Sequence, residues 1–529
     1  MKKALLILTF ISIAILGKST GIQVGIGSGF TYNTISAACT AGVIKAGDTV
    51  YVHAGVYTDN LGMTGLIGTS SQWITIRPYK NDSVSIQNEY TVTNVAYLKI
   101  TGLNFYGNNS IRKTSSGSTA VHLLFFSGAP ACYTSIHDII VQNCKFTDLN
   151  NTGYTVSTGD MLKIDNTNNF QVLNCLFENG TNITDGIGLN ADKNGLVKNC
   201  RFENIGTLTE GTDGSHCKGG SIYITYEANL FINCGGSGLD IGGDTGTPYF
   251  CPAYNAATSF EADSCYVFSN IFIGGYTSIR LGSCWNTEVY NNTCFKIDGF
   301  ALRTLNESQN PIYVKNNHVY NNIFTTYTSF GIYMNFTGQK TTDYYSTEFF
   351  YNNLFHSYKG ADPSSINWNE DFVSPVVSGA VVSGSIIGDP QFNDTTSMDF
   401  SLKSGSPAIA KGYSVSSPAM DYNGSNFGTK RSIGAIEYAG NTLGVTNYEE
   451  ANHIVVYPNP STGEFNVSWT GTGTIQNVEI YNMLGQLTYA VRPSGYTTRF
   501  NLSAMPKGVY KAVFYTNNGS VSTSTLLLD

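Results

Sequence analysis

The sequence predicts an all-β protein in which a right-handed parallel β-helix is followed by a small C-terminal β-sandwich. Three observations lead to this prediction. With 41% hydrophobic and only 12% charged residues, the 529-residue chain has enough apolar material for a long core. Its 56 glycines suit a fold with many tight turns. A short motif recurs through the chain, a Cys or Asn, any residue and then usually Phe, and segments with alternating apolar residues separate its copies.

Residues 1–20 have the layout of a secretory signal peptide. Lys2 and Lys3 precede an apolar run that extends from Ala4 to Leu16 and is too short to span a membrane. We therefore expect an exported protein without a transmembrane segment. The formal net charge of −8 argues against a general nucleic-acid-binding role, so we expect no nucleic-acid partner. We also expect a monomer.

The β-helix is expected to cover residues 21–386. Residues 32–45 predict a short amphipathic helix that covers the open end of the first coil. From Cys144 onward the motif recurs at intervals of 31, 25, 29, 41, 22, 30 and 31 residues. The shortest interval therefore defines one coil, and the longer intervals contain insertions.

The Cys and Asn residues of the motif are interpreted as structural. An Asn at a coil corner can bond backbone groups above and below it, and it tolerates a left-handed turn. This interpretation covers Asn143, Asn174, Asn199, Asn292, Asn322 and Asn353. The 11 cysteines are an odd number, so at least one has no partner within the chain, and Cys144, Cys175 and Cys200 predict a ladder of small buried residues. Whether Cys251 pairs with Cys265 stays open.

Six segments predict strands that stack in one column of the β-helix: residues 186–190, 214–218, 238–242, 278–282, 299–303 and 331–335. Their second and fourth residues are almost all apolar and face inward, so the third and fifth residues face outward. The third positions are Gly188, His216, Asp240, Arg280, Ala301 and Tyr333. The fifth positions are Asn190, Lys218, Gly242, Gly282, Arg303 and Asn335. Because neighbouring strands lie about 4.8 Å apart, the charged residues share one patch, which is the candidate site.

The strands that contain Asp213, Asp240 and Arg280 resemble, in order and in column, the metal-binding and catalytic strands of polysaccharide lyase family nine. The resemblance implies a right-handed parallel β-helix that cleaves pectate by Ca²⁺-assisted β-elimination. Two features of the family pattern differ here. The family's aspartate pair is replaced by Gly236 and Ser237, and its lysine base is replaced by Arg280.

β-Elimination on a uronate needs a positive charge near the carboxylate, a base, and a group that assists the leaving oxygen. The catalytic candidates are Lys218, Arg280, Arg303 and His216. Since Ca²⁺ prefers oxygen ligands, its candidate ligands are Asp213, Asp240, Asp244 and Glu261. The substrate-binding candidates are Tyr249, Tyr333 and Asn335. The largest insertion, residues 243–264, supplies some of these residues and is expected beside the patch.

Other interpretations stay open beside a lyase that acts on an acidic, uronate-containing polysaccharide. A glycoside hydrolase of the same fold would use paired carboxylates, for which Asp213, Asp240 and Asp244 are candidates. A glycan-binding protein or adhesin without catalysis would need only surface aromatic residues such as Tyr333, Tyr344 and Tyr345. Asp240 and Arg280 could also form no more than a surface salt bridge.

The C-terminal part of the chain divides into three segments. Residues 387–438 are expected to close the β-helix as an end cap, with Asp389 and Asp421 as turn residues. Residues 439–450 are expected to form a linker, and residues 451–529 contain the motifs VVYPNPSTGEFNV, VEIYNMLGQL and LSAMPKGVYKAVFY. These motifs resemble the C-terminal sorting domain of the Bacteroidetes type IX secretion system. The resemblance implies a small β-sandwich, the type IX secretion machinery as a partner, and a destination outside the cell or on its surface.

Overall fold

The structure is a computed structural model that describes two stretches of the chain. These are residues 21–440 and 454–529, except residues 59–61, 108–121, 129–131, 150–158, 182–183, 207–211, 306–311, 313, 328–332, 338–348, 359–366, 369–383, 416–419, 458, 470–474, 483–485, 492–496 and 517–520. The chain divides into two compact units, Met1–Tyr438 and Ala439–Asp529. The predicted signal peptide lies outside the described residues. No helix among the described residues is long and apolar enough to cross a membrane.

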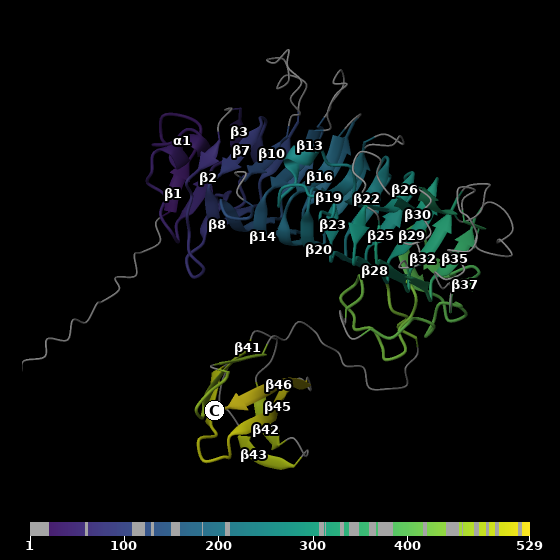
Figure 1. Ribbon diagram of the computed structural model, residues 1–529. Helices are drawn as coiled ribbons and strands as arrows, with labels where there is room; N and C mark the ends of the chain where they lie inside the picture. Colours follow the sequence, from purple (N-terminus) through teal and green to yellow (C-terminus); the bar gives the residue numbers. More distant parts are fainter. Residues whose placement is uncertain are drawn as a thin grey trace, which may run out of the picture. The chain divides into compact units, whose positions relative to one another are not determined.

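The first unit is a parallel β-helix whose coils contribute strands to three long parallel sheets, here named A, B and C (Figure 1). Within each sheet the strand order follows the chain, because each coil stacks on the one before it. This arrangement confirms the predicted parallel β-helix.

Sheet C positions the candidate site. Its strands, in order, are β4 (Met63–Thr64), β7 (Tyr90–Thr93), β10 (Leu124–Ser127), β13 (Gly159–Asp165), β16 (Thr184–Asn190), β19 (Asp213–Lys218), β22 (Ser237–Gly242), β26 (Thr277–Gly282), β30 (Phe300–Leu305), β33 (Tyr333–Thr337) and β36 (Asn367–Trp368).

Sheets A and B form the other two faces. Sheet A contains β1 (Gly21–Val24), β2 (Thr49–Val52), β5 (Ile74–Pro78), β8 (Val95–Thr101), β11 (Ile136–Gln142), β14 (Thr167–Leu173), β17 (Lys193–Lys198), β20 (Ser221–Glu227), β24 (Tyr266–Phe268), β28 (Glu288–Tyr290), β31 (His318–Tyr320) and β34 (Phe349–Tyr351), with β23 (Ala262–Asp263) paired to β20 and β27 (Cys284–Trp285) paired to β23. Sheet B contains β3 (Gly55–Tyr57), β6 (Val84–Ile86), β9 (Asn104–Tyr106), β12 (Lys145–Thr147), β15 (Leu176–Gly180), β18 (Arg201–Ile205), β21 (Leu230–Ile232), β25 (Ile271–Ile273), β29 (Thr293–Ile297), β32 (Ile323–Thr326), β35 (Leu354–Ser357) and β37 (Ile386–Ile387).

The helix before these coils is shorter than predicted. α1 (Ile35–Thr40) occupies only the middle of residues 32–45, and the Thr34 hydroxyl caps it by accepting a hydrogen bond from the Ala37 N–H at 3.0 Å. Ile35 and Ala38 are buried against the first coils, at the purple end of the β-helix in Figure 1. The helix thus lies at the end of the β-helix that it was expected to cover.

Stacked aromatic rings run through the core. Phe105, Phe146, Phe177, Phe202, Phe231 and Phe272 are the Phe residues of successive motif copies. Neighbouring ring centroids lie 4.5–4.9 Å apart, and the ring planes are within 7° of parallel. Beside them, Cys144, Cys175 and Cys200 are buried free cysteines, as predicted. The Phe and Cys residues of the recurring motif are therefore core residues of the stacked coils.

Asn residues support the corners of the coils, as the sequence analysis predicts. Asn143, Asn174 and Asn199 adopt left-handed backbone conformations with φ of 53°, 52° and 54°. Farther along the chain, Asn229, Asn270, Asn292, Asn322 and Asn353 form a buried amide ladder. Each backbone N–H donates to the side-chain Oδ1 of the next Asn at 2.9–3.0 Å.

The described residues of the segment 387–438, which leave out 416–419, pack along the side of the β-helix. Within this segment β38 (Phe392–Asp394) pairs antiparallel with β39 (Asp399–Leu402), and Phe392 and Phe400 pack edge-on against Phe295 of sheet B. The Asn291 side-chain amide also donates to the carbonyl oxygens of Ser432 and Gly434. The described part of the segment packs against the outward side of several coils, and its function as an end cap stays a prediction.

The second unit contains two antiparallel sheets. One consists of β40 (Ile454–Tyr457), β41 (Glu464–Trp469) and β44 (Thr497–Asn501), and the other of β43 (Leu487–Val491), β42 (Ile475–Asn482), β45 (Gly508–Thr516) and β46 (Val521–Leu528). Phe465, Val478 and Phe514 belong to one apolar core that both sheets share. This arrangement confirms the predicted small β-sandwich.

Candidate functional site

Sheet C places part of the predicted patch in register on consecutive coils. The Cα partners run from Gly188 to His216, then to Asp240, and on to Arg280, as the sequence analysis predicts. The next step differs, because Arg280 pairs with Arg303 and not with Ala301. Strand β30 is therefore displaced by two residues from its predicted register.

The shift moves Arg303 from the neighbourhood of Lys218 to that of Arg280. Gly282, which was expected opposite Arg303, pairs with Leu305 instead. Arg303 therefore does not follow Lys218, Gly242 and Gly282 in one file, and instead forms a pair of arginines on adjacent strands with Arg280. On β33, Asn335 pairs with Arg303, and Tyr333 pairs with Asn367 of β36. The substrate-binding roles of Tyr333 and Asn335 stay predictions.

Strand β13 adds functional groups that the sequence analysis missed. Its Cα partners on β16 are Asp185 for Asp160, Gly188 for Lys163 and Asn190 for Asp165. The outward file of sheet C, as we use the term below, comprises Lys163, Gly188, His216, Asp240, Arg280 and Arg303. A signal was available in the sequence, because Asp160, Asp185 and Asp213 each stand three residues before a member of this file.

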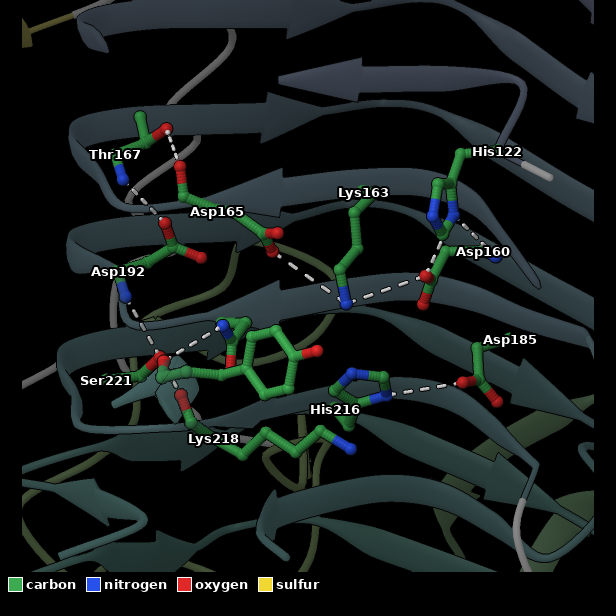
Figure 2. A network of polar contacts seen from close by, with 12 residues as sticks. His122, Asp160, Lys163, Asp165, Thr167, Asp185, Asp192, His216, Lys218 and Ser221 are labelled. Carbon is green, nitrogen blue, oxygen red and sulfur yellow. Dashed lines mark hydrogen bonds and ion pairs between the residues drawn. The ribbon is translucent and has the colours of Figure 1, made fainter. Parts of the chain in front are cut away.

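The Asp160 carboxylate is buried beside Lys163 and His122 (Figure 2). Its Oδ2 lies 3.0 Å from His122 Nδ1 and 3.5 Å from Lys163 Nζ. Burial raises the pKa of Asp160, but Lys163 and His122 outweigh it and hold the pKa below its usual value. Burial lowers the pKa of Lys163, but Asp160 and then Asp165 raise it above its ordinary value, so the ammonium stays charged.

A glycine makes room for this carboxylate on the next coil. A Cβ atom at Gly188 would lie 2.0 Å from Asp160 Oδ1 and 2.6 Å from Asp160 Cγ. Any side chain at position 188 would therefore displace the Asp160 carboxylate. In effect, Asp160 occupies the place in the outward file between Lys163 and His216.

Asp185, Asp213 and His216 form a second buried group beside Asp160. Asp185 Oδ1 accepts a hydrogen bond from the Asp213 N–H at 2.7 Å, while Asp185 Oδ2 lies 3.4 Å from His216 Nδ1 (Figure 2). Burial, and next the neighbouring carboxylate of Asp160, raises the pKa of Asp185 to about 7. Burial, and next the carboxylate of Asp185, raises the pKa of Asp213 to about 7. Burial, with Lys218 as the next cause, lowers the pKa of His216 well below its usual value. His216 is only 3% exposed, which corrects the expectation of a solvent-facing side chain.

Asp240, Arg280, Arg303 and Lys218 lie on the strands that follow. Arg280 NH1 is 3.2 Å from Asp240 Oδ2, and the two side chains are 18% and 5% exposed, so this ion pair is mostly buried. The Arg303 guanidinium lies 5.7 Å from the centre of the Phe300 ring. A Cβ at Gly243 would lie 3.4 Å from Lys218 Cδ and 3.6 Å from Asp240 Oδ2. The Lys218 stem and the Asp240 carboxylate therefore both lie beside Gly243.

The insertion of residues 243–264 is attached to the β-helix at two points. Glu261 is 1% exposed, and its two carboxylate oxygens accept hydrogen bonds from the backbone N–H groups of Gly219 and Thr245 at 2.9 and 2.8 Å. A disulfide joins Cys132 to Cys251, while Cys265 is a free cysteine. Glu261 therefore has a structural function as a brace, and the open question about Cys251 is answered.

Tyr249 lies exposed beside the C-terminal end of β16. It is the last residue of the short helix η1 (Thr247–Tyr249), its side chain is 69% exposed, and its carbonyl oxygen accepts a hydrogen bond from the Asn190 amide at 3.4 Å. Asn190 is the Cα partner of Lys218. An exposed aromatic ring thus lies near the cationic part of the site.

The four predicted Ca²⁺ ligands do not form one site. Both oxygens of Glu261 accept backbone hydrogen bonds, Asp240 faces Arg280, and Asp244 is half-buried in the insertion. Among the described residues, the set of three metal-ligating side chains with ligand atoms within 4.8 Å of one another is Asp160, Asp185 and His216. The residues present therefore do not fit the expected Ca²⁺ site, and we assign no chemical step to Ca²⁺.

One comparison with known protein families identifies the C-terminal unit. Residues 455–528 match the family described as secretion system C-terminal sorting domain. This match confirms the resemblance drawn from the motifs of that segment. A search of curated proteins found no match.

Several solved structures are similar to this chain at low identity. A family 6 polysaccharide lyase from Pseudopedobacter saltans is 14% identical with a TM-score of 0.43, and the alignment covers 71% of this chain and 96% of the lyase. A family 6 alginate lyase is 10% identical with a TM-score of 0.38, and 73% of this chain and 57% of that chain are covered. The Dettilon tailspike protein is 10% identical with a TM-score of 0.37, and 93% of this chain and 86% of the tailspike are covered. We rest no conclusion on these similarities.

Proposed function

We propose that this protein is exported and cleaves an acidic, uronate-containing polysaccharide by β-elimination on the outward face of sheet C. The observation that carries the proposal is the series of cationic side chains that the coils place there, Lys163, Lys218, Arg280 and Arg303. A polymer with a carboxylate on successive sugars presents a matching series of negative charges. Complementary charges of this kind speed association and fix the register of binding.

Arg280 and Arg303 are the proposed carboxylate-binding pair. They are Cα partners on β26 and β30, so their backbones lie about 4.8 Å apart. A guanidinium presents a planar fork that matches a carboxylate, and the ion pair with Asp240 holds the Arg280 side chain in place. Neutralising the uronate carboxylate makes the C5 proton easier to remove.

Lys218 is the proposed base for that proton. Its side chain is half-buried on β19, and an amine gives up its own proton to become a base far more readily than a guanidinium. Lys163, in contrast, is held by Asp160 and Asp165, and His216 is too buried for us to assign it contact with a sugar. In the proposed step the C5–H and C4–O bonds break, a C4–C5 double bond forms, and the leaving oxygen takes up a proton.

Tyr249 and the C-terminal unit complete the proposal. The exposed Tyr249 ring has the flat apolar face on which a sugar stacks. The sorting domain supports export by the type IX secretion system to the outside of the cell or to its surface.

A glycoside hydrolase is the second candidate function. Hydrolysis of a glycosidic bond uses two neighbouring carboxylates, and the candidates for that reaction stay Asp213, Asp240 and Asp244. A hydrolase would release products without a double bond.

The test is an assay of the purified full chain on a panel of soluble uronate polymers and neutral polymers. Ultraviolet absorbance reports the C4–C5 double bond, and a reducing-end assay reports every cleavage. We expect both signals on a uronate polymer. Reducing ends without absorbance would support the hydrolase, and binding without cleavage would support an adhesin.

Lys218→Ala tests the assignment of the base. Turnover should fall at least about 100-fold, since a positioned base contributes that much or more. Lys145→Ala is the matched control, because Lys145 forms an ion pair with Glu178 on sheet B, away from the proposed site. Full turnover in Lys218→Ala would show that another group removes the proton.

A further inference from the structure

We infer that sheet C contains a buried site for a divalent transition-metal ion of the Zn²⁺ type, formed by Asp160, Asp185 and His216. One ligand atom of each residue lies within 4.8 Å of the others. The three residues are 2%, 1% and 3% exposed, so they form a closed set on three consecutive strands. The inference does not depend on the proposed reaction.

The imidazole of His216 is the first observation that points to an ion. Its Nδ1 is 3.4 Å from Asp185 Oδ2, longer than an ordinary hydrogen bond of about 2.7–3.2 Å. The buried imidazole therefore makes no ordinary hydrogen bond with Asp185 through Nδ1, and a buried polar group without one is costly.

The Nδ1 to Oδ2 distance fits a shared metal ion. A Zn²⁺ ion lies about 2.0–2.1 Å from nitrogen and oxygen ligands, so two ligands at a tetrahedral angle stand about 3.3 Å apart. The observed separation is 3.4 Å. Asp213 Oδ2, at 3.9 Å from His216 Nδ1, lies at the edge of the same set.

The two carboxylates are each held by one oxygen and leave the other for the ion. Asp160 Oδ2 contacts His122 and Lys163, while Asp160 Oδ1 is buried without a hydrogen-bond partner among the described residues. Asp185 Oδ1 accepts from the Asp213 N–H, which leaves Oδ2 toward His216. Outer contacts of this kind orient the ligands of metal sites.

Gly188 belongs to the same arrangement. Because a Cβ there would lie 2.0 Å from Asp160 Oδ1, the glycine is what allows this oxygen to reach the strand beside His216. One substitution at a residue that is not a ligand should therefore disturb the site.

The ligand set selects the class of ion. One imidazole nitrogen and two carboxylates suit Zn²⁺ and similar transition metals. Ca²⁺ takes six to eight oxygen ligands in a roomier shell, which a buried set with a histidine does not supply. The site thus differs from the Ca²⁺ site expected from the sequence in both its residues and its ion.

The test is calorimetric titration of the chelator-treated full chain with Zn²⁺ and, separately, with Ca²⁺, supported by native mass spectrometry. We expect one Zn²⁺ per chain and no comparable binding of Ca²⁺. His216→Gln and Gly188→Ala should each weaken Zn²⁺ binding at least about tenfold. Glu178→Gln, which changes a carboxylate that pairs with Lys145 on sheet B, is the control and should bind Zn²⁺ as the unaltered chain does.

Three results would overturn the inference: no Zn²⁺ binding by the folded chain, equal binding by all three variants, or Ca²⁺ binding as tight as Zn²⁺. Because Gly188→Ala keeps every ligand, it separates loss of geometry from loss of a ligand if His216→Gln fails to fold. No substrate is present in this titration. If the chain binds Zn²⁺ but cleaves no uronate polymer, the metal-site inference stands and the proposed function is wrong.

Discussion

At the scale of single residues, burial determines how much the ion pair between Asp240 and Arg280 contributes to stability. Exposed ion pairs contribute little to stability, and the sequence left open that this pair is a surface salt bridge. In the structure the Asp240 side chain is 5% exposed and the Arg280 side chain 18%. Removing one partner of such a pair leaves the other charge buried without its counter-ion.

We therefore expect Arg280→Ala to lower the free energy of unfolding by about 3 kcal/mol or more. The double variant Arg280→Gln with Asp240→Asn should recover most of this loss, because no charge is then left unpaired. Denaturant unfolding of the purified chains measures both. If the free energy of unfolding of Arg280→Ala falls by less than about 1 kcal/mol, the pair contributes no more than an ordinary exposed ion pair.

The stacked Phe residues show how one residue in each coil stabilises a whole element. Phe177 is fully buried between Phe146 and Phe202, with ring centroids 4.8 and 4.9 Å away. Offset aromatic pairs add to the free energy of burial itself. A gap in the stack therefore removes contacts from the coils on both sides.

Phe177→Ala should lower the free energy of unfolding by about 3–5 kcal/mol, the usual loss when a buried Phe is truncated. The control is Tyr266→Ala, because the Tyr266 side chain is 41% exposed and its truncation should change stability by about 0.5 kcal/mol or less. Both values come from denaturant unfolding. Similar losses in the two variants would argue against the stack as a stabilising element.

The insertion of residues 243–264 behaves as an element tied at two points. Glu261 braces it through hydrogen bonds to the Gly219 and Thr245 N–H groups, and the Cys132–Cys251 disulfide holds it at a second point. Tyr249 is exposed and lies between Thr245, whose N–H Glu261 binds, and Cys251. The disulfide should therefore control how far the segment around Tyr249 can open.

Reduction of the disulfide, or the double variant Cys132→Ser with Cys251→Ser, should speed cleavage after Tyr249 by a protease specific for aromatic residues. Proteolysis needs a segment that can open, and the loss of one tie allows this. Mass spectrometry of a timed digest measures the rate. Cleavage sites within the C-terminal unit serve as the internal control, and an unchanged rate at Tyr249 would contradict the account.

The β-helix was predictable from the sequence because one pattern repeats and every repeat occupies the same place, whereas the β-sandwich was predicted from motifs that resemble a sorting domain. The register of His216, Asp240 and Arg280 followed from glycines at equal positions. Strand β30 was placed two residues out of register for a physical reason. Side chains alternate with a period of two, so a slip of two residues keeps apolar residues inward and leaves the pattern unchanged.

Other features of the site could not be predicted, because they depend on contacts between residues that no sequence pattern shows. Asp160 reaches its position because Gly188, on a different coil, has no side chain. Glu261 was named as a metal ligand, but loop geometry points its oxygens at backbone N–H groups. The burial of His216 likewise depends on its neighbours from several coils. Residue type and spacing thus located the face of the site, and packing decided the function of each residue.

At the scale of the whole molecule, the chain combines a unit that carries the proposed site with a unit that matches a sorting domain. We expect deletion of residues 446–529 to leave the protein folded but retained in the periplasm. Cell fractionation measures this, and expression of the full-length chain in the same deletion strain is the control. Normal appearance of the truncated protein outside the cell would show that the C-terminal unit does not direct export.

The most direct test of the proposed function is calorimetric titration of the full chain with a uronate oligosaccharide too short to be cleaved. Arg303→Gln should weaken binding at least about tenfold, or about 1.4 kcal/mol, since it removes one of the two proposed carboxylate-binding groups. Lys198→Gln, which removes a cation that pairs with Glu227 on sheet A, should leave binding unchanged. Equal affinities in the unaltered chain and Arg303→Gln, or equally tight binding of a neutral oligosaccharide, would contradict an acidic-polysaccharide site on the outward face of sheet C.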